Sequence, residues 1–224
     1  MALTGFLARR SFVTRGLAAL GLAGSAATGL EAAPAQSAPE GRWQGSKHAE
    51  DEWYDKISGL HRFVFDTISP DGFQSSLMFA GTYMDANKNK YGLQDSDNAI
   101  IIIARSRSTR FGYNDAMWAK YGKQFAEAMN NLVDPKTKEA PIVNIHATSG
   151  GALDRLIKRG AHVAICEVAT RGAAGSLARA IGGDTDALFK ELSENLVTNG
   201  KLVPAGIVAV NRAQEHGYAV YAGG

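Results

Sequence analysis

The only cysteine of the chain, Cys166, is the residue with the most distinctive chemistry. It follows the mostly apolar run 161–165 and precedes small residues with helical spacing, so we expect it where a strand ends and a helix begins. In parallel sheets this carboxyl edge is where ligands bind. A helix N-terminus favours the thiolate, which is the nucleophilic form of cysteine. The alternative is a buried structural cysteine, since free cysteine is among the most buried residue types.

Charged and hydroxyl residues near Cys166 complete a candidate substrate site. Arg171 is close enough in sequence to favour a thiolate, Glu167 acts in the opposite sense, and Thr170 lies between them. Arg105 opens the segment 105–110, which has three arginines among hydroxyl residues and is predicted to be a loop beyond the sheet edge. That loop either binds an anion or is a solvated basic loop.

A single thiolate without a second cysteine can take part in acyl, alkyl or sulfur transfer. In sulfur transfer it holds a sulfane sulfur as a persulfide, and an acceptor attacks the outer sulfur. The Gly-x-Ser-x-Gly elbow of serine hydrolases is missing, and no glycine-rich phosphate pattern follows the first expected strand. A papain-like site would need a histidine and an acid near Cys166, which the sequence does not place there.

Metal ligands are sparse in the sequence. The Cys-x-x-Cys and His-Glu-x-x-His patterns of zinc sites and the Cys-x-x-Cys-His pattern of covalent haem are all missing. A copper site made by Cys166 with His146 or His162 remains an alternative. However, His162 lies four residues earlier on the same expected strand, about 13 Å away along it. We therefore expect no metal and no cofactor.

The N-terminus has the pattern of an export signal. Arg9 and Arg10 precede Ser-Phe-Val, an uncharged stretch follows at 17–30, and 33–35 is a small-x-small cleavage site. We predict a twin-arginine signal peptide at 1–35 and a periplasmic location. The stretch 17–30 is too short for a membrane span, so we expect no membrane association after the signal is removed. Residues 36–58 are expected to form a flexible lead-in, disordered to about residue 49 and with a helical turn or two at 51–58, and 59–224 a single domain.

The charge balance excludes one class of partner. Residues 36–224 contain 21 basic and 21 acidic residues, so we expect no binding to nucleic acid. One cysteine cannot form an internal disulfide, and an idle exposed thiol is a liability in an oxidising compartment. Cys166 is therefore expected to be either buried or in use.

The hydrophobic pattern predicts an α/β domain. We expect strands at 60–67, 99–104, 161–165, 201–203 and 218–222, with helices at 73–84, 114–131, 153–157, 174–181, 185–196 and 204–215. Residues 87–97 are expected to be a polar connection, and Asn114 to cap its helix. The run 99–104 has no polar face, so it should be a central parallel strand. The order of elements predicts a five-stranded, mostly parallel sheet with helices on both faces.

Four segments together resemble the DsrE/DsrF-like family: 114–121, 160–166, 202–207 and 210–218. The similarity runs from about residue 60 to the end. It implies a small three-layer, flavodoxin-like α/β fold, homo-oligomers such as trimers or hexamers, and a sulfur-carrying cysteine at Cys166. The chain differs from many relatives in having Arg105 and Ser106 in place of a His-Gly pair, and in its export signal.

The resemblance and the lone thiol lead to one hypothesis and one alternative. The hypothesis is an exported persulfide carrier in which Arg171, Thr170 and Arg105 hold an anionic sulfur species on Cys166, served by a sulfur donor or acceptor protein. The alternative is a non-catalytic oligomeric module that binds a ligand or partner and whose cysteine is structural.

Overall fold

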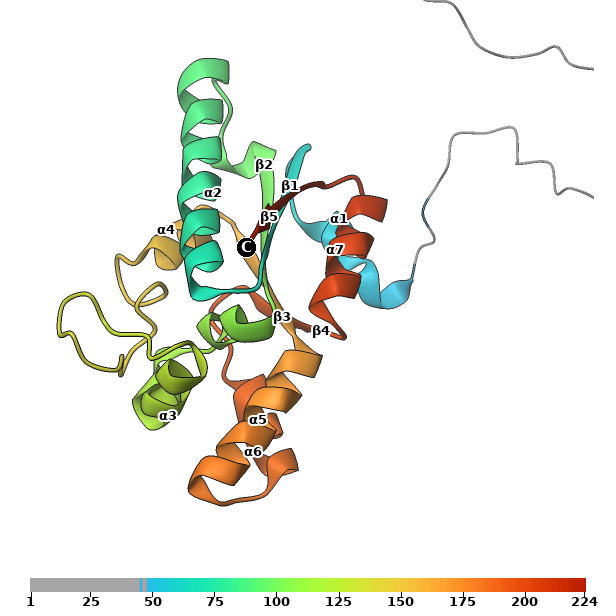
Figure 1. The fold of residues 1–224 in the computed structure, drawn as a ribbon. Coiled ribbons are helices and arrows are strands. Elements are labelled where there is room, and N and C mark those ends of the chain that lie inside the picture. The colour runs from blue at the N-terminus through green and yellow to red at the C-terminus, as the bar shows by residue number, and fades with distance from the viewer. Residues whose placement is uncertain (1–44, 46–47) are drawn as a thin grey trace, which may run out of the picture. The chain divides into compact units, whose positions relative to one another are not determined.

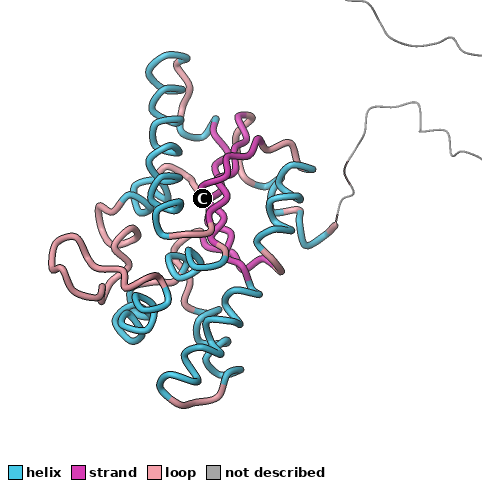
Figure 2. The backbone as a smooth tube through the Cα atoms, in the orientation of Figure 1, coloured by secondary structure: helices cyan, strands magenta, loops and turns pink. Residues whose placement is uncertain are grey.

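The computed structural model describes residue 45 and residues 48–224. The predicted signal peptide, and residues 36–44 and 46–47 of the predicted lead-in, lie outside the described residues. Within them, the sheet is made of β1 (His61–Thr67), β2 (Asn98–Ala104), β3 (His162–Cys166), β4 (Gly200–Val203) and β5 (Ala219–Gly223). All neighbouring strands are parallel, in the order β4-β3-β2-β1-β5. Figure 2 shows this sheet running through the middle of the domain, with helices on both sides.

Helices cover both faces of the sheet. The α-helices are α1 (Trp53–Lys56), α2 (Pro70–Tyr91), α3 (Asp115–Ala128), α4 (Ala152–Lys158), α5 (Glu167–Ile181), α6 (Thr185–Glu194) and α7 (Gly206–Glu215). Short 3-10 helices are η1 (Ala49–Asp51), η2 (Asp95–Asp97) and η3 (Ser106–Gly112). Figure 1 shows α1 and α7 on one side of the sheet and α2 and α4 on the other.

Handedness explains this distribution. The chain crosses the sheet in one direction from β1 to β4, so right-handed connections put their helices on one face. It then returns past β1 to reach β5, and the same handedness puts α7 on the opposite face. The predicted three-layer, flavodoxin-like α/β architecture is confirmed, and the sheet is all-parallel. Its strand order differs from the 2-1-3-4-5 order of flavodoxin itself.

The core consists of two hydrophobic clusters separated by the sheet. All seven residues of β2 are buried, with Ile100 and Ile102 in the cluster under α2, α3 and α5, and Ile101 and Ile103 in the cluster under α1 and α7. Successive residues of a strand point to opposite faces, so an apolar run without alternation must be covered on both sides. The prediction of a central strand at 99–104 is thus confirmed.

The second half of the predicted lead-in is packed on the domain. Tyr54 is 1% exposed, its hydroxyl donates to the carbonyl of Ala209 at 3.1 Å, and its carbonyl accepts from the hydroxyl of Tyr218 at 2.9 Å. Ile57 is also buried. Residues 48–58 therefore form part of the domain, because their apolar side chains cover the face of the sheet beside α7. The sequence-based boundary at residue 59 is corrected accordingly.

The long helix α2 extends beyond its predicted end. Residues 87–91, expected to belong to a polar connection, form its last turn. Asn87 is held by a hydrogen bond from its side-chain amide to the side-chain oxygen of Asn98 at 2.6 Å. The helix ends at Gly92, which has a φ of 70°, a left-handed conformation that glycine adopts without strain.

Two further boundaries differ between sequence and structure. The segment 105–110, expected to be a loop, enters the 3-10 helix η3. There the buried hydroxyl of Ser108 lies within hydrogen-bonding distance of the carbonyls of Thr67 and Arg105, at 3.0 and 2.8 Å. Helix α3, expected to continue to residue 131, ends at Ala128, and Asn130 and Asn131 take positive φ angles of 61° and 57°. Asparagine tolerates this conformation better than most residues, so it can end a helix.

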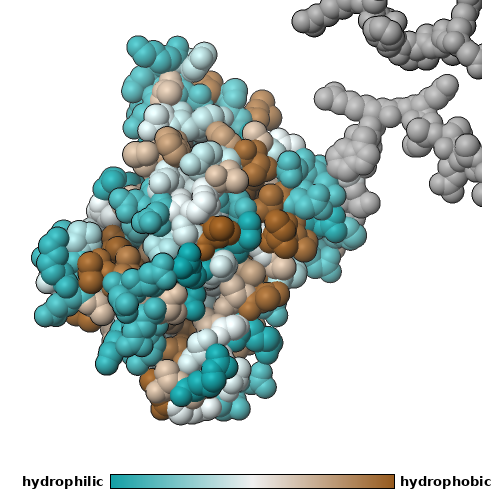
Figure 3. Space-filling model, viewed as in Figure 1, coloured by the Kyte–Doolittle hydropathy of each residue, from teal (hydrophilic) through white to brown (hydrophobic). Residues whose placement is uncertain are grey.

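Apolar and polar residues are interspersed over the surface seen in Figure 3. In the part of the chain that the structure describes, no helix combines the length and the apolar character needed to cross a membrane.

Candidate functional site

Three side chains from neighbouring strands share one face at the carboxyl edge of the sheet. They are Asp66 of β1, Arg105 directly after β2, and Cys166 at the end of β3. Along each strand, the side chains point alternately to the two faces of the sheet. Their counterparts two residues earlier, Val64, Ile103 and Ala164, belong to the cluster that α7 covers. Period-two alternation therefore places the three side chains on the α7 side. They lie in the order β3-β2-β1 across the sheet.

Cys166 joins β3 to α5. It is the last residue of the strand and the N-cap of the helix, and its Sγ accepts a hydrogen bond from the backbone N–H of Ala169 at 3.4 Å. This is the contact that a serine or asparagine makes at an N-cap, here made by sulfur. The N–H groups of the first helical turn that lack intrahelical partners point towards this position. The residue is 6% exposed.

Arg105 presents a fixed positive charge beside the thiol. Its Nε and Nη2 donate to the two carboxylate oxygens of Asp66 at 2.7 and 2.8 Å, a bidentate pair. The hydrogen bonds to Asp66 raise the pKa of Arg105, and the negative form of Cys166 adds to this effect. The Arg105 side chain keeps 27% of its surface exposed, whereas that of Asp66 keeps 8%.

A glycine lets Arg105 approach the start of α7. A Cβ at Gly206 would lie 2.5 Å from the Cβ of Arg105, which is closer than such atoms come in proteins. The preceding N-cap residue, Ala205, has no side-chain hydrogen bond to the first turn of the helix. Any side chain at position 206 would therefore push Arg105 away from α7 and from its pair with Asp66.

Thr170 acts on the backbone around the cysteine. Its hydroxyl donates to the carbonyl of Cys166 at 2.9 Å and accepts from the hydroxyl of Tyr113 at 3.0 Å, and the residue is fully buried. Burial raises the pKa of Tyr113, which keeps the phenol protonated as the donor. Thr170 thus fixes the turn from β3 into α5, and its contacts are internal to the protein.

The structure directs Arg171 towards α6. Its Nη1 lies 3.1 Å from a carboxylate oxygen of Asp186, and its guanidinium stands 4.0 Å from the ring centroid of Phe189. Arg171 follows Thr170 in helix α5, and successive side chains of a helix are rotated by about 100° because 3.6 residues make a turn. The two side chains therefore point in different directions. The candidate site therefore unites Cys166 with Arg105 and, through the backbone, with Thr170, and it does not include Arg171.

Two residues of the site were not predicted from the sequence. Asp66 is the one carboxylate of β1 and directly follows the apolar run 63–65. A buried charge needs a partner, so its position was an available signal. The sequence gives no comparable signal for Gly206, because its role depends on how closely Arg105 approaches the start of α7 in the folded protein.

The histidines considered as copper ligands lie elsewhere. His146 packs against Phe73 and Phe111, with ring centroids 5.5 and 4.7 Å away, and burial lowers its pKa to about 4. His162 begins β3, at the end opposite to Cys166, and burial lowers its pKa. Within residues 45 and 48–224, no three His, Cys, Asp or Glu side chains group in a way that could hold a metal ion.

Comparisons with known proteins do not add to this site. The chain matches no protein-family model, and no curated protein is significantly similar to it. The resemblance to the DsrE/DsrF-like family therefore stays a prediction from the sequence.

Proposed function

We propose that this protein carries sulfane sulfur on Cys166 as a persulfide. The observation that supports the proposal is the Arg105 guanidinium, fixed by Asp66 on the same sheet face as Cys166, whose sulfur caps helix α5. A cation and a helix N-terminus both stabilise an anionic sulfur, whether a thiolate or the terminal sulfur of a persulfide.

The chemistry requires a donor with a sulfane sulfur and no cofactor. The Cys166 thiolate attacks the outer sulfur of thiosulfate, a new S–S bond forms, and sulfite leaves with the electron pair of the bond that breaks. The charge of the thiolate passes to the outer sulfur of the persulfide, where Arg105 can balance it. An acceptor thiolate then attacks that outer sulfur and restores the Cys166 thiolate.

An apolar rim around the edge of the sheet suits a protein partner for this transfer. Val168 and Ile207, in the first turns of α5 and α7, are 66% and 60% exposed, and Ile68 after β1 is 37% exposed. Exposed apolar side chains are common at surfaces that dock other proteins. A sulfur donor or acceptor protein docking here would reach the thiol without solvent between them.

The test is mass spectrometry of the intact protein after incubation with thiosulfate or inorganic polysulfide. We expect the mass to rise by that of one sulfur atom, and to stay unchanged in Cys166→Ser. Arg105→Gln should slow formation of the adduct about tenfold, the effect of a lost charge contact of ~1.4 kcal/mol. Arg171→Gln, which removes an arginine paired with Asp186 instead, should leave the rate unchanged.

The competing function is a binding module with a structural cysteine. Cys166 is only 6% exposed, and its Sγ accepts a hydrogen bond from the backbone N–H of Ala169. Both observations favour a structural cysteine. Titration of the native protein with a thiol reagent separates the two functions. If the Cys166 thiol reacts in the native protein, the persulfide carrier is supported. If it reacts only after denaturation, and no sulfur adduct forms, the persulfide carrier is refuted.

Location and assembly form part of the same proposal. We propose that the chain is exported to the periplasm through its twin-arginine signal and works there as a homo-oligomer. Replacing Arg9 and Arg10 by lysine should keep the protein out of the periplasmic fraction. Sedimentation of the mature protein measures the oligomeric state, and a monomer at all concentrations would contradict that part of the proposal.

A further inference from the structure

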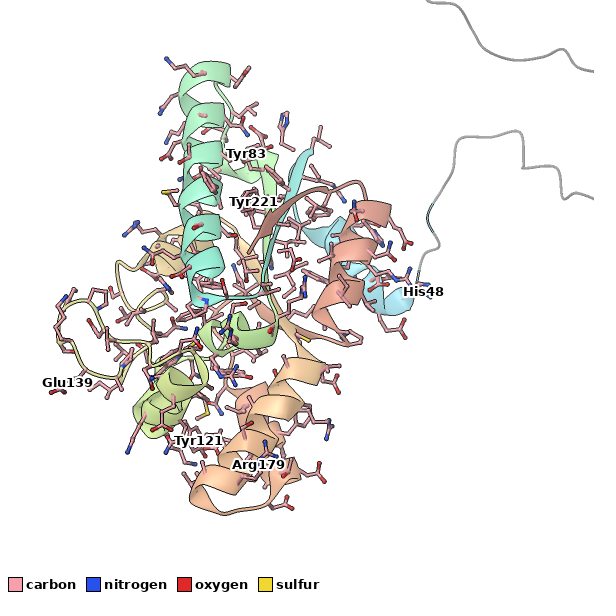
Figure 4. All side chains as sticks on the ribbon, in the orientation of Figure 1. His48, Tyr83, Tyr121, Glu139, Arg179 and Tyr221 are labelled. Carbon is pink, nitrogen blue, oxygen red and sulfur yellow. The ribbon has the colours of Figure 1, made fainter. Side chains whose placement is uncertain are left out.

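A second site lies between α3 and α5, on the sheet face opposite to α7. A pocket of about 260 Å³ opens there, and Figure 4 labels Tyr121 on α3 and Arg179 on α5, the two helices that flank it. The apolar part of its wall is made of Phe125, Ala128, Ala173, Leu177 and Ala180, and Gln124, Glu127 and Ser176 add polar side chains. Arg110, from η3, provides the positively charged part of the wall.

The guanidinium of Arg110 has no anionic partner among the described residues. Its Nη1 makes only long hydrogen bonds, of 3.4 Å, to the carbonyls of Ser106 and Arg107, and its Nε is buried without a partner. Burial lowers the pKa of Arg110. By contrast, Arg105 and Arg159 each pair with a carboxylate. A partly buried charge without a counter-ion is costly, so its retention in a pocket points to a missing anion.

We propose that this pocket binds a small monocarboxylate with a short apolar tail. The ligand carboxylate would accept hydrogen bonds from the Arg110 guanidinium, whose planar fork suits that group. Phe125 and Leu177 would contact the tail. The volume lies just below the range of about 300–1,000 Å³ for drug-sized ligands, so the ligand must be small.

The pocket's charge pattern favours one negative charge over two. Glu127 lies at the exposed rim of the pocket and makes no ion pair with Arg110. It would repel the second charge of a dianion, whereas an uncharged tail meets no such repulsion from the apolar residues of the wall or from Gln124 and Ser176. The site is separate from Cys166, because α3 and α5 pack on the sheet face opposite to the one that carries Asp66, Arg105 and Cys166.

Calorimetric titration with hexanoate tests the proposal, with hexanol as the uncharged control. We expect saturable binding of hexanoate and at least tenfold weaker binding of hexanol, since a charge-assisted hydrogen bond contributes ~1.5–3 kcal/mol. Arg110→Gln should weaken hexanoate binding to the same degree. The matched control is Arg107→Gln, which removes an exposed arginine of the same 3-10 helix, bonded to Asn130; it should change the affinity less than twofold.

A second variant keeps the test decisive if Arg110→Gln does not fold. Ala180 is exposed at the pocket rim, so Ala180→Phe should block the pocket while Arg110 stays in place and the melting temperature stays unchanged. We expect this variant to lose hexanoate binding. Absence of saturable binding to the natural sequence, or equal affinity in Ala180→Phe, would overturn the proposal.

Discussion

Arg105 and Arg171 both pair with an aspartate, but in different surroundings. The pair of Arg105 with Asp66 is bidentate and largely enclosed, whereas Arg171 and Asp186 keep 51% and 84% of their side chains exposed. Exposed pairs contribute little because water and salt screen them, while removing one partner of an enclosed pair leaves a charge without compensation. The two pairs therefore offer a direct comparison within one protein.

Asp66→Asn should lower the free energy of unfolding by about 1–3 kcal/mol, because it leaves Arg105 partly buried without its carboxylate. Asp186→Asn, the matched change in the exposed pair, should alter it by less than about 0.5 kcal/mol. Urea unfolding of the two variants and the natural sequence measures both values. Equal losses in the two variants would contradict the importance of enclosure.

His146 should make the protein sensitive to acid. Burial among Phe73 and Phe111 lowers its pKa to about 4, below the ordinary value of about 6.5. Between these pH values the unfolded chain binds a proton that the folded one does not, so stability is present above pH 6.5 and is lost as pH falls towards 4. The loss attributable to this residue should reach up to about 3 kcal/mol.

The matched control for this prediction is His146→Gln, which cannot titrate. Urea unfolding at pH 7 and at pH 4.5 should show a smaller loss of stability in this variant than in the natural sequence. Other groups titrate equally in both proteins, so the difference between the two losses isolates His146. Identical losses would show that the ring is solvated or rearranges on protonation.

At the residue scale the sequence predicted Cys166 and its position between strand and helix, because apolar runs and helical spacing are local signals. It also selected Arg105, which follows the strand next to the one that ends at Cys166, on the same face of the sheet. It selected Arg171 by nearness in sequence, and the structure pairs that residue with Asp186, fifteen positions later. Side-chain direction depends on what a helix packs against, which the local sequence does not contain.

At the scale of elements, two glycines inside helices have opposite roles. A Cβ at Gly81 of α2 would meet nothing within 4 Å. A Cβ at Gly122 of α3 would lie 2.0 Å from the carbonyl oxygen of Pro141, so the helix and the segment at 141 touch through their backbones. Glycine in a helix costs backbone entropy, and only at residue 122 does close packing offset that cost.

Gly81→Ala should therefore stabilise the protein by about 0.4–1 kcal/mol through the lower entropy of the unfolded chain. Gly122→Ala should destabilise it by about 1–3 kcal/mol, since the clash is with backbone that cannot rotate away. Thermal unfolding of the two variants measures both effects. A gain in stability at both positions would show that α3 moves away from the segment at 141 without cost.

The sequence predicted which segments are helices and strands better than it predicted where they end. Helix α2 shows the physical reason. Its apolar spacing identified the helix, but the last turn is polar and is held by Asn87 bonding to Asn98. The 3-10 helix after Arg105 likewise depends on Ser108 bonding to the end of β1. Such contacts join segments distant in sequence, so neither hydrophobic period nor composition reveals them.

At the scale of the whole molecule, the two faces of the sheet are covered unequally. The connections from β1 to β4 place α2, α3, α4 and α5 on one face, while the return to β5 leaves α7 on the other. The single helix α7 is too narrow to cover a face of five strands. The residues just before β1 therefore cover the rest of the face on which α7 lies. Tyr54 and Ile57 pack there against Val64, Ala209 and Tyr218.

Removing these residues should thus uncover the core. We expect a chain that begins at residue 59 to be less stable than one that begins at residue 48 by roughly 4–9 kcal/mol, the sum expected for two buried side chains and the two Tyr54 hydrogen bonds. Tyr54→Ala in the longer chain should account for about 3–5 kcal/mol of that loss. Lys56→Ala, at a residue whose side chain is 73% exposed, should change it by less than about 0.5 kcal/mol. Urea unfolding compares the four proteins, and equal stability of the two chain lengths would mean that the third layer needs α7 alone.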